Sequence, residues 1–146
     1  MINTDVRDND VVALRALIDG WAEAMRAKDA DRAMAHCAAD VVTFDLAPPL
    51  VSSVNAKDLE AWFATWQGPL GYEVRDLKIG AGEDVAFCHS LNRLSGTKID
   101  GEKADVWFRQ TFCFRKIRGD WRIAHQHESV PFYMDGSYRA AVDLKP

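Results

Sequence analysis

The spacing of apolar residues changes once along this chain, near Leu70, and this change constrains the fold more than any other feature. Before it, apolar residues recur every three or four positions, as on one face of a helix. After it, they alternate with polar residues, as in a strand. Helices followed by strands are typical of an α+β fold with an antiparallel meander. We therefore expect three N-terminal helices packed in a curved, mostly antiparallel sheet around a single pocket.

The expected elements fill most of the 146 residues, which is the length of one domain. Asp100-Gly101 lies between two alternating runs and is a strong hairpin signal. We expect residues 1–9 to be disordered and residues 132–146 to form a tail that packs on the domain. The expected helices cover about 10–28, a short segment after Asp29, and 55–67. The expected strands cover 41–46, 72–79, 85–97, 104–115 and 121–130.

The charge and the cysteines of the chain limit its partners and its compartment. The net charge is −4, and no basic stripe stands ready to neutralise phosphates, so we expect no nucleic-acid partner. No apolar run approaches the length of a membrane span, so we expect no membrane partner. Cys37, Cys88 and Cys113 are odd in number and include no CxxC pair, which favours a reducing compartment. We therefore expect a cytoplasmic protein.

The last expected strand changes character along its length. Its alternation puts five residues on one face: Trp121, Ile123, His125, His127 and Ser129. That face begins apolar and becomes polar toward its C-terminal end. The gradient indicates a pocket with an apolar base and polar functional groups above it.

The 104–115 strand carries bulky residues on both faces, which a sheet solvated on one side would not do. Trp107 and Arg109 alternate there with Phe108, Gln110 and Phe112. One face must pack against the helices, and the other must be shielded from water by a second surface. We expect a second copy of the chain to supply that surface, so we expect a homodimer.

Three stretches of the chain resemble the SnoaL-like branch of the nuclear transport factor 2-like superfamily, which includes ketosteroid isomerases. The first runs from Trp21 to Asp31, the second is Ala39-Asp40-Val41-Val42-Thr43-Phe44-Asp45, and the third runs from Gly119 to Ser129. The resemblance covers about residues 10–132. It implies a cone-shaped α+β barrel with an interior pocket, usually a homodimer. The family hosts isomerases, cyclases, dehydratases and epoxide hydrolases, as well as binding modules.

The resemblance also implies roles for single residues. In ketosteroid isomerases a carboxylate near the end of the first strand shuttles a proton, and Asp45 corresponds to it; an apolar setting makes a carboxylate a better general base. The oxyanion donors of those enzymes, a tyrosine and a protonated aspartate, correspond here to Trp21 and to Gln110 or a neighbour. In the cyclase branch the acid–base group lies on the last strand, where this chain has His125 and His127.

We therefore expect Asp45, His127 and His125 as catalytic candidates. Each also has a structural reading, as a strand-end or wall residue. Arg109 could hold an anionic substrate group or pair with Asp45. The candidates for substrate binding are aromatic residues and one arginine: Trp21, Trp62, Phe63, Trp107, Arg109 and Trp121.

Four residues of the chain are of the types that bind metal ions, but their spacing matches no known metal-binding motif. His125 and His127 with His89 and Asp45 could hold zinc or iron, but no HExxH spacing or cysteine pair supports this. We expect no cofactor and no metal.

Three functions remain from the sequence. The first is an isomerase, cyclase or hydratase that transfers a proton on an apolar carbonyl compound without a redox cofactor. The second is a non-catalytic module that binds an apolar ligand. The third is a dimeric scaffold whose pocket is filled by its own side chains.

Overall fold

The computed structural model describes residues 4–146, and of residues 4–6 only the backbone. The helices are α1 (Thr4–Ala27), α2 (Ala30–Met34) and α3 (Ala56–Phe63). The strands are β1 (Cys37–Phe44), β2 (Trp66–Ala81), β3 (Val85–Lys98), β4 (Lys103–Ile117) and β5 (Asp120–Ser129). The predicted α+β class is confirmed. Within the described residues, no helix is both long and apolar enough to cross a membrane.

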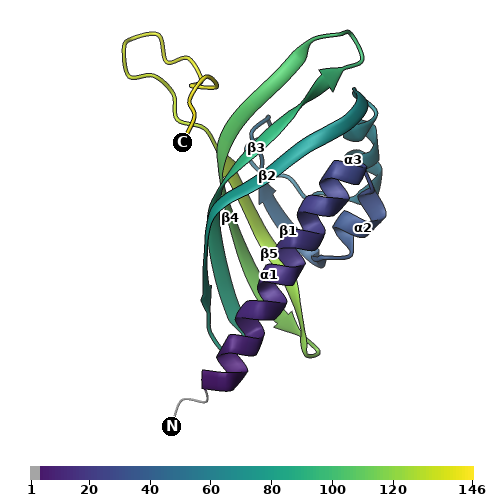
Figure 1. Ribbon diagram of the computed structural model, residues 1–146, viewed down its shortest axis with the longest axis vertical. Coiled ribbons are helices and arrows are strands. Elements are labelled where there is room, and N and C mark those ends of the chain that lie inside the picture. The colour runs from purple at the N-terminus through teal and green to yellow at the C-terminus, as the bar shows by residue number, and fades with distance from the viewer. Residues whose placement is uncertain (1–3) are drawn as a thin grey trace.

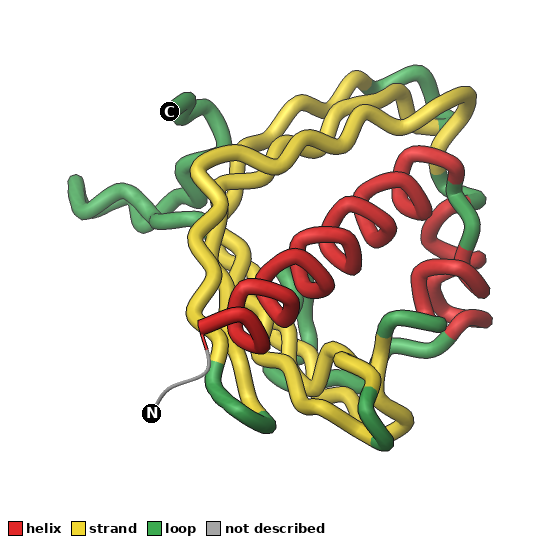
Figure 2. The backbone as a smooth tube through the Cα atoms, turned by 60° about the horizontal axis from the view of Figure 1, so that its bottom comes forward, coloured by secondary structure: helices red, strands yellow, loops and turns green. Residues whose placement is uncertain are grey.

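One curved sheet of five strands, in the order β1-β5-β4-β3-β2, forms the body of the molecule. β1 pairs with β5 in parallel and the other pairs are antiparallel, so the sheet is mostly antiparallel, as predicted. Its edges, β1 and β2, do not pair with each other within the described chain, so the sheet is an open cone and not a closed barrel. Figure 1 shows α1 running along the curved sheet, and Figure 2 shows α2 and α3 beside its open side.

The core lies between α1 and the concave face of the sheet. Leu14, Ile18 and Trp21 recur at helical spacing on α1 and are almost completely buried. The Trp21 ring meets Phe112 of β4 edge-on, with the ring centroids 5.6 Å apart. Burial of this apolar stripe, worth about 1.5–3 kcal/mol for each large side chain, holds the helix inside the cone.

The first turns of α1 correct one expectation from the sequence. Of the residues predicted to be disordered, 1–3 lie outside the described part, whereas 4–9 are helical. Asp10 anchors this end, since its Oδ1 accepts hydrogen bonds from Lys116 Nζ (2.9 Å) and Trp121 Nε1 (3.0 Å). The β4–β5 hairpin thus holds α1 at Asp10, and the helix continues from there to Thr4.

The third helix is shorter and the next strand longer than predicted. α3 ends at Phe63, and β2 already begins at Trp66, which pairs with Lys98 of β3. The helical spacing of aromatic residues continued to Trp66, but that side chain contributes to the core from a strand. Strand pairing with β3 overrides the local pattern at this boundary.

The C-terminal tail also differs from its prediction. Figure 1 shows the tail projecting from the sheet. Phe132, Met134 and Tyr138 are 54%, 81% and 67% exposed, so they do not pack on the domain as expected. The Phe132 and Tyr138 rings contact each other, with the centroids 5.9 Å apart. The tail is therefore folded mainly on itself.

A β-bulge in β5 determines which side chains enter the cone. Phe114 of β4 pairs with Ile123, but the preceding residue, Cys113, pairs with His125. Ala124 is therefore an extra residue without a partner. Such an insertion moves every later side chain of the strand to the opposite face.

Candidate functional site

A pocket of about 470 Å³ lies between the helices and the concave face of the sheet. Its wall is largely aromatic and aliphatic. The aromatic residues that line it are Trp21 from α1, Trp62 from α3, Trp66 and Tyr72 from β2, and Phe108 from β4. An apolar pocket with a few polar groups is the usual form of a small-molecule site.

Asp45, at the end of β1, is one of two carboxylates that line this pocket on the side of the first strand. Its Oδ2 accepts hydrogen bonds from Ser52 Oγ (2.8 Å) and Thr43 Oγ1 (3.3 Å). The backbones of Ser52 and Thr43 pair as an isolated bridge, which fixes both hydroxyls. Oδ1 accepts no hydrogen bond from the described residues, so one carboxylate oxygen is free to meet a ligand.

Glu128, near the end of β5, is the second of these carboxylates. Its Oε1 accepts a hydrogen bond of 2.5 Å from Gln126 Nε2. Burial raises the pKa of Glu128 to about 7, and the charge of Asp45 acts in the same direction, while the Gln126 hydrogen bond opposes them. A carboxyl group with this pKa can both donate and accept a proton at neutral pH.

The two carboxylates lie where two spaces meet. An outer hollow of about 580 Å³ is bounded by residues 44–51, His127 and Glu128. Asp45 and Glu128 line both this hollow and the inner pocket.

A buried polar network adjoins Glu128. Gln110 of β4 pairs with Glu128 across the strands. Its Oε1 accepts hydrogen bonds from the Tyr72 hydroxyl (2.9 Å) and from Asn92 Nδ2 (3.0 Å). Burial raises the pKa of Tyr72, so its phenol stays neutral and remains a donor. The network holds the polar side of the pocket rigid without placing a further charge there.

Three buried donors have no hydrogen-bond partner among the described residues: Trp21 Nε1, Trp66 Nε1 and Gln110 Nε2. The three side chains are 4%, 5% and 1% exposed. Trp21 and Trp66 line the pocket. An unpaired buried donor costs roughly 1–3 kcal/mol, so an acceptor atom of a ligand would find these groups unsatisfied.

The structure brings together some of the candidates from the sequence. Asp45, Trp21 and Trp62 line the pocket, as predicted. Phe63 is buried in the core and is absent from the pocket wall. Trp121 is likewise buried away from it, where its indole binds Asp10.

Two further candidates for substrate binding lie on the convex face of the sheet. Trp107 stacks there beneath the guanidinium groups of Arg75 and Arg93, 5.8 and 6.0 Å from its ring centroid. Arg109 is exposed, and its Nε donates to Ser129 Oγ at 3.0 Å. The expectation that Arg109 contacts Asp45 or an anion in the pocket is wrong, because Arg109 alternates with the inward-facing Gln110.

Because of the bulge at Ala124, the two histidines do not lie on the face of β5 that was predicted for them. Because the bulge reverses the alternation, His125 and His127 do not share a face with Ile123, and Gln126 and Glu128 turn inward instead. The Nδ1 of His125 lies 2.7 Å from the Val42 carbonyl oxygen.

Both histidine rings contact Phe44 edge-on, with the centroids 4.6 and 5.3 Å apart. His127 borders the outer hollow only. Among the side chains that the structure describes, no group of three His, Cys, Asp or Glu residues could hold a metal ion.

Sequence reasoning missed Glu128, the partly buried acid of the site. Strict alternation put Glu128 on the face opposite the predicted pocket. The bulge that turns it inward occurs at an alanine, and no glycine or proline between Trp121 and Ser129 signals it. Only the pairing of β5 with β4 reveals the bulge.

The fold is that of the cone-shaped proteins of the nuclear transport factor 2-like (NTF2-like) class. Residues 14–133 match the SnoaL-like domain family, and the chain belongs to that family. No curated protein matches the chain.

Solved structures with the same fold differ widely in sequence identity. An NTF2-like protein of unknown function from Pseudomonas putida KT2440 is 30% identical over 100% of both chains, with a TM-score of 0.83. A candidate scytalone dehydratase from Novosphingobium aromaticivorans is 15% identical over 94% of this chain and 95% of that one, with a TM-score of 0.79. A ketosteroid isomerase-like protein from Erwinia carotovora atroseptica is 21% identical over 81% and 93%, with a TM-score of 0.66.

Proposed function

We propose that this protein is an enzyme that transfers a proton on an apolar carbonyl compound, with Asp45 and Glu128 as its acid–base groups. The observation that carries the proposal is that both carboxylates line one aromatic pocket, and that Glu128 is partly buried in it. Isomerisation, aldol-type cyclisation and dehydration can each begin with removal of a proton beside a carbonyl group. The names of two structural neighbours, an isomerase-like protein and a candidate dehydratase, agree with this class of reaction.

The proposed step moves one proton and leaves every other atom in place. The ionised Glu128 removes a proton from the carbon next to the carbonyl. The electron pair of that C–H bond becomes a C=C bond, and the π pair of the carbonyl moves onto its oxygen, which gives an enolate. Glu128, now protonated, returns the proton to a carbon of the same framework. We assign the Trp21 indole N–H, which has no hydrogen-bond partner among the described residues and belongs to the pocket wall, as the donor to the enolate oxygen.

A direct test uses a simple ketone, because the natural substrate need not be known. The protein and 2-tetralone, an apolar ketone with acidic α-protons, are mixed in deuterium oxide, and loss of the α-proton signal is followed by proton NMR. We expect the protein to accelerate exchange in proportion to its concentration. Exchange no faster than in buffer containing an equal concentration of acetate would contradict the proposal.

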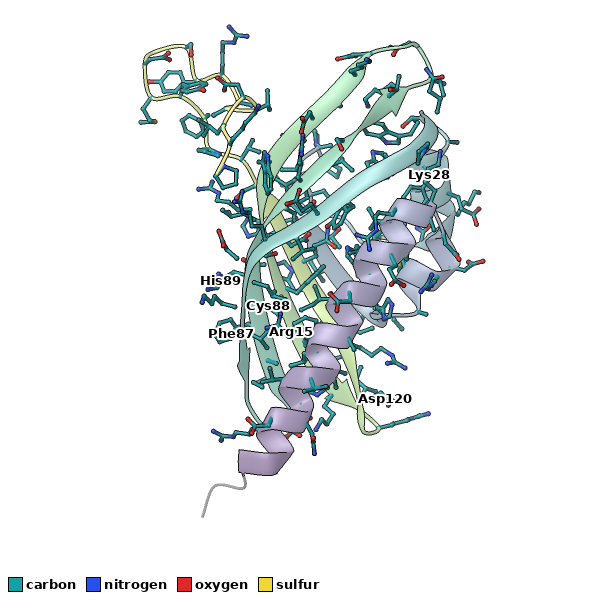
Figure 3. All side chains as sticks on the ribbon, viewed as in Figure 1. Arg15, Lys28, Phe87, Cys88, His89 and Asp120 are labelled. Carbon is teal, nitrogen blue, oxygen red and sulfur yellow. The ribbon has the colours of Figure 1, made fainter. Side chains whose placement is uncertain are left out.

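We also propose that the chain forms a homodimer through the convex face of the sheet. Val85 and Phe87 of β3 are 62% and 52% exposed, although both are large and apolar. Figure 3 shows Phe87 and His89 projecting from the side of the sheet away from α1. An exposed apolar patch of this kind is typical of an interaction surface.

Sedimentation equilibrium tests the dimer. We expect a mass of twice the 16.4 kDa chain for the wild type. We expect Phe87→Glu to weaken dimerisation by about 30-fold or more, because it buries a charge at the centre of the contact. Val12→Glu changes an equally exposed apolar residue of α1 and should leave the dimer intact. A monomeric wild type would contradict the proposed homodimer.

A further inference from the structure

We infer that the ligand of the inner pocket is an apolar molecule that carries a carboxylate, and that Lys98 and the indole N–H of Trp66 hold this carboxylate. The inference rests on the proposed function in so far as it takes the inner pocket to be the substrate site. It adds the class of substrate, an elongated apolar acid, and the end of the pocket at which its charge is bound.

Lys98 and Trp66 face each other at one end of the pocket. The two residues are paired across β3 and β2, and both line the pocket. The Lys98 ammonium lies over the Trp66 indole, 4.6 Å from the ring centroid. This contact holds a cation against the face of the indole without neutralising it.

Lys98 is the one cationic residue among the described residues that line the pocket. Its Nζ forms no salt bridge with, and donates no hydrogen bond to, any described residue. Asp58, which also lines the pocket, accepts a hydrogen bond of 2.7 Å from Asn55 Nδ2 at the start of α3 and forms no salt bridge with Lys98. The positive charge of Lys98 is therefore available to a ligand.

The Trp66 indole supplies a second, independent indication of a ligand. The side chain is 5% exposed, and its Nε1 has no partner among the described residues. A cation over the indole face and an unpaired N–H donor of the same ring suit the two oxygens of a carboxylate, which forms its strongest hydrogen bonds with charged donors. Bound there, a carboxylate would satisfy the buried donor and pair the free ammonium.

The strand register separates this end of the pocket from the proposed acid–base groups. Glu128 faces Gln110 on β4. From Gln110, the pocket wall continues along β4 through Phe108, Val106 and Ala104 toward the hairpin that follows Lys98. The stretch between the two ends is apolar. A ligand with its carboxylate at Lys98 thus places its apolar body along this wall and keeps its charge away from Glu128 and Asp45.

Lys98 takes the role that the sequence suggested for Arg109. Arg109 is a cation on β4 but points to the convex face, whereas Lys98 on β3 is nearer the hairpin and enters the pocket wall. The period of two along each strand decides which of the two cations can meet a ligand inside the cone.

Two probes of almost equal shape test the inference, 2-naphthoate and its neutral amide, 2-naphthamide. Their binding is measured by quenching of tryptophan fluorescence at about pH 6, where Glu128 with its pKa near 7 is mostly protonated. We expect the wild type to bind 2-naphthoate about tenfold or more tightly than 2-naphthamide. Lys98→Met should abolish this preference, and Trp66→Phe should reduce it while keeping an aromatic ring.

The matched control is Lys103→Met, an exposed lysine on β4 that does not line the pocket, and it should keep the preference. Equal binding of the two probes by the wild type, or binding of neither, would overturn the inference. An unchanged preference in Lys98→Met would also overturn it. The exchange assay with 2-tetralone stays informative in each case, because that ketone is neutral and tests the proton transfer without a carboxylate.

Discussion

Replacement of Glu128 by glutamine is expected to lower the rate of α-proton exchange in 2-tetralone by about 100-fold or more, which is the usual contribution of a positioned acid–base group. The amide has nearly the same shape and keeps an oxygen at which Gln126 Nε2 can donate. It cannot accept the proton from carbon. The loss should appear in kcat, with little change in the affinity for the ketone, because the substitution removes a step and leaves the pocket wall unchanged.

Glu73→Gln is the matched control for this result, since Glu73 is an exposed glutamate of β2 that does not line the pocket. It should keep the full rate. His127→Ala separates the two assignments of the acid–base group on β5. If His127→Ala abolished exchange while Glu128→Gln kept it, the assignment from the sequence would be right and the assignment to Glu128 wrong.

The same Glu128→Gln substitution is expected to stabilise the fold at alkaline pH. The pKa of Glu128 rises from 4.5 to about 7 on folding, chiefly because the carboxyl is buried. Below about pH 4.5 the group is protonated in both the folded and the unfolded chain, so it costs nothing. As the pH rises from about 4.5 to about 7, the unfolded chain ionises first and stability is lost, until above about 7 the folded state is ionised as well.

Above that window the free energy of unfolding of Glu128→Gln should exceed that of the wild type by about 2–3 kcal/mol, because the neutral amide escapes the cost of a buried charge. Urea unfolding at about pH 4 and about pH 8 measures the difference, which should be near zero at the lower value. Equal stability of the two proteins at both values would mean that the carboxyl of Glu128 is solvated in the folded state.

Much of the fold could be predicted from the sequence because it depends on periodicity. The stripe of Leu14, Ile18 and Trp21 and the alternation of the later strands are local patterns, and each forms the predicted element. The boundaries failed where contacts between distant segments decide them. α1 begins early because Asp10 meets the β4–β5 hairpin, and α3 ends early because Trp66 pairs with β3.

The sequence indicated residues of the helices and of the end of β1 that line the pocket, but not which residues of β5 do so. Trp21 and Trp62 follow from helical spacing, and Asp45 follows from its place at the end of a strand. Glu128 depends on the single unpaired residue Ala124, and a shift of one residue reverses the face of every side chain after it. No local pattern distinguishes this bulge from regular alternation, so the polar wall was assigned to His125 and His127.

The central claim is that Glu128 is an acid–base group partly buried in the pocket. Titration of carboxyl-carbon NMR signals in protein labelled at glutamate tests it most directly, with the signal assigned by its disappearance in Glu128→Gln. We expect a midpoint near 7 that falls in Asp45→Asn, because the charge of Asp45 contributes to the raised pKa of Glu128. A midpoint near 4.5 that Asp45→Asn does not move would contradict the account.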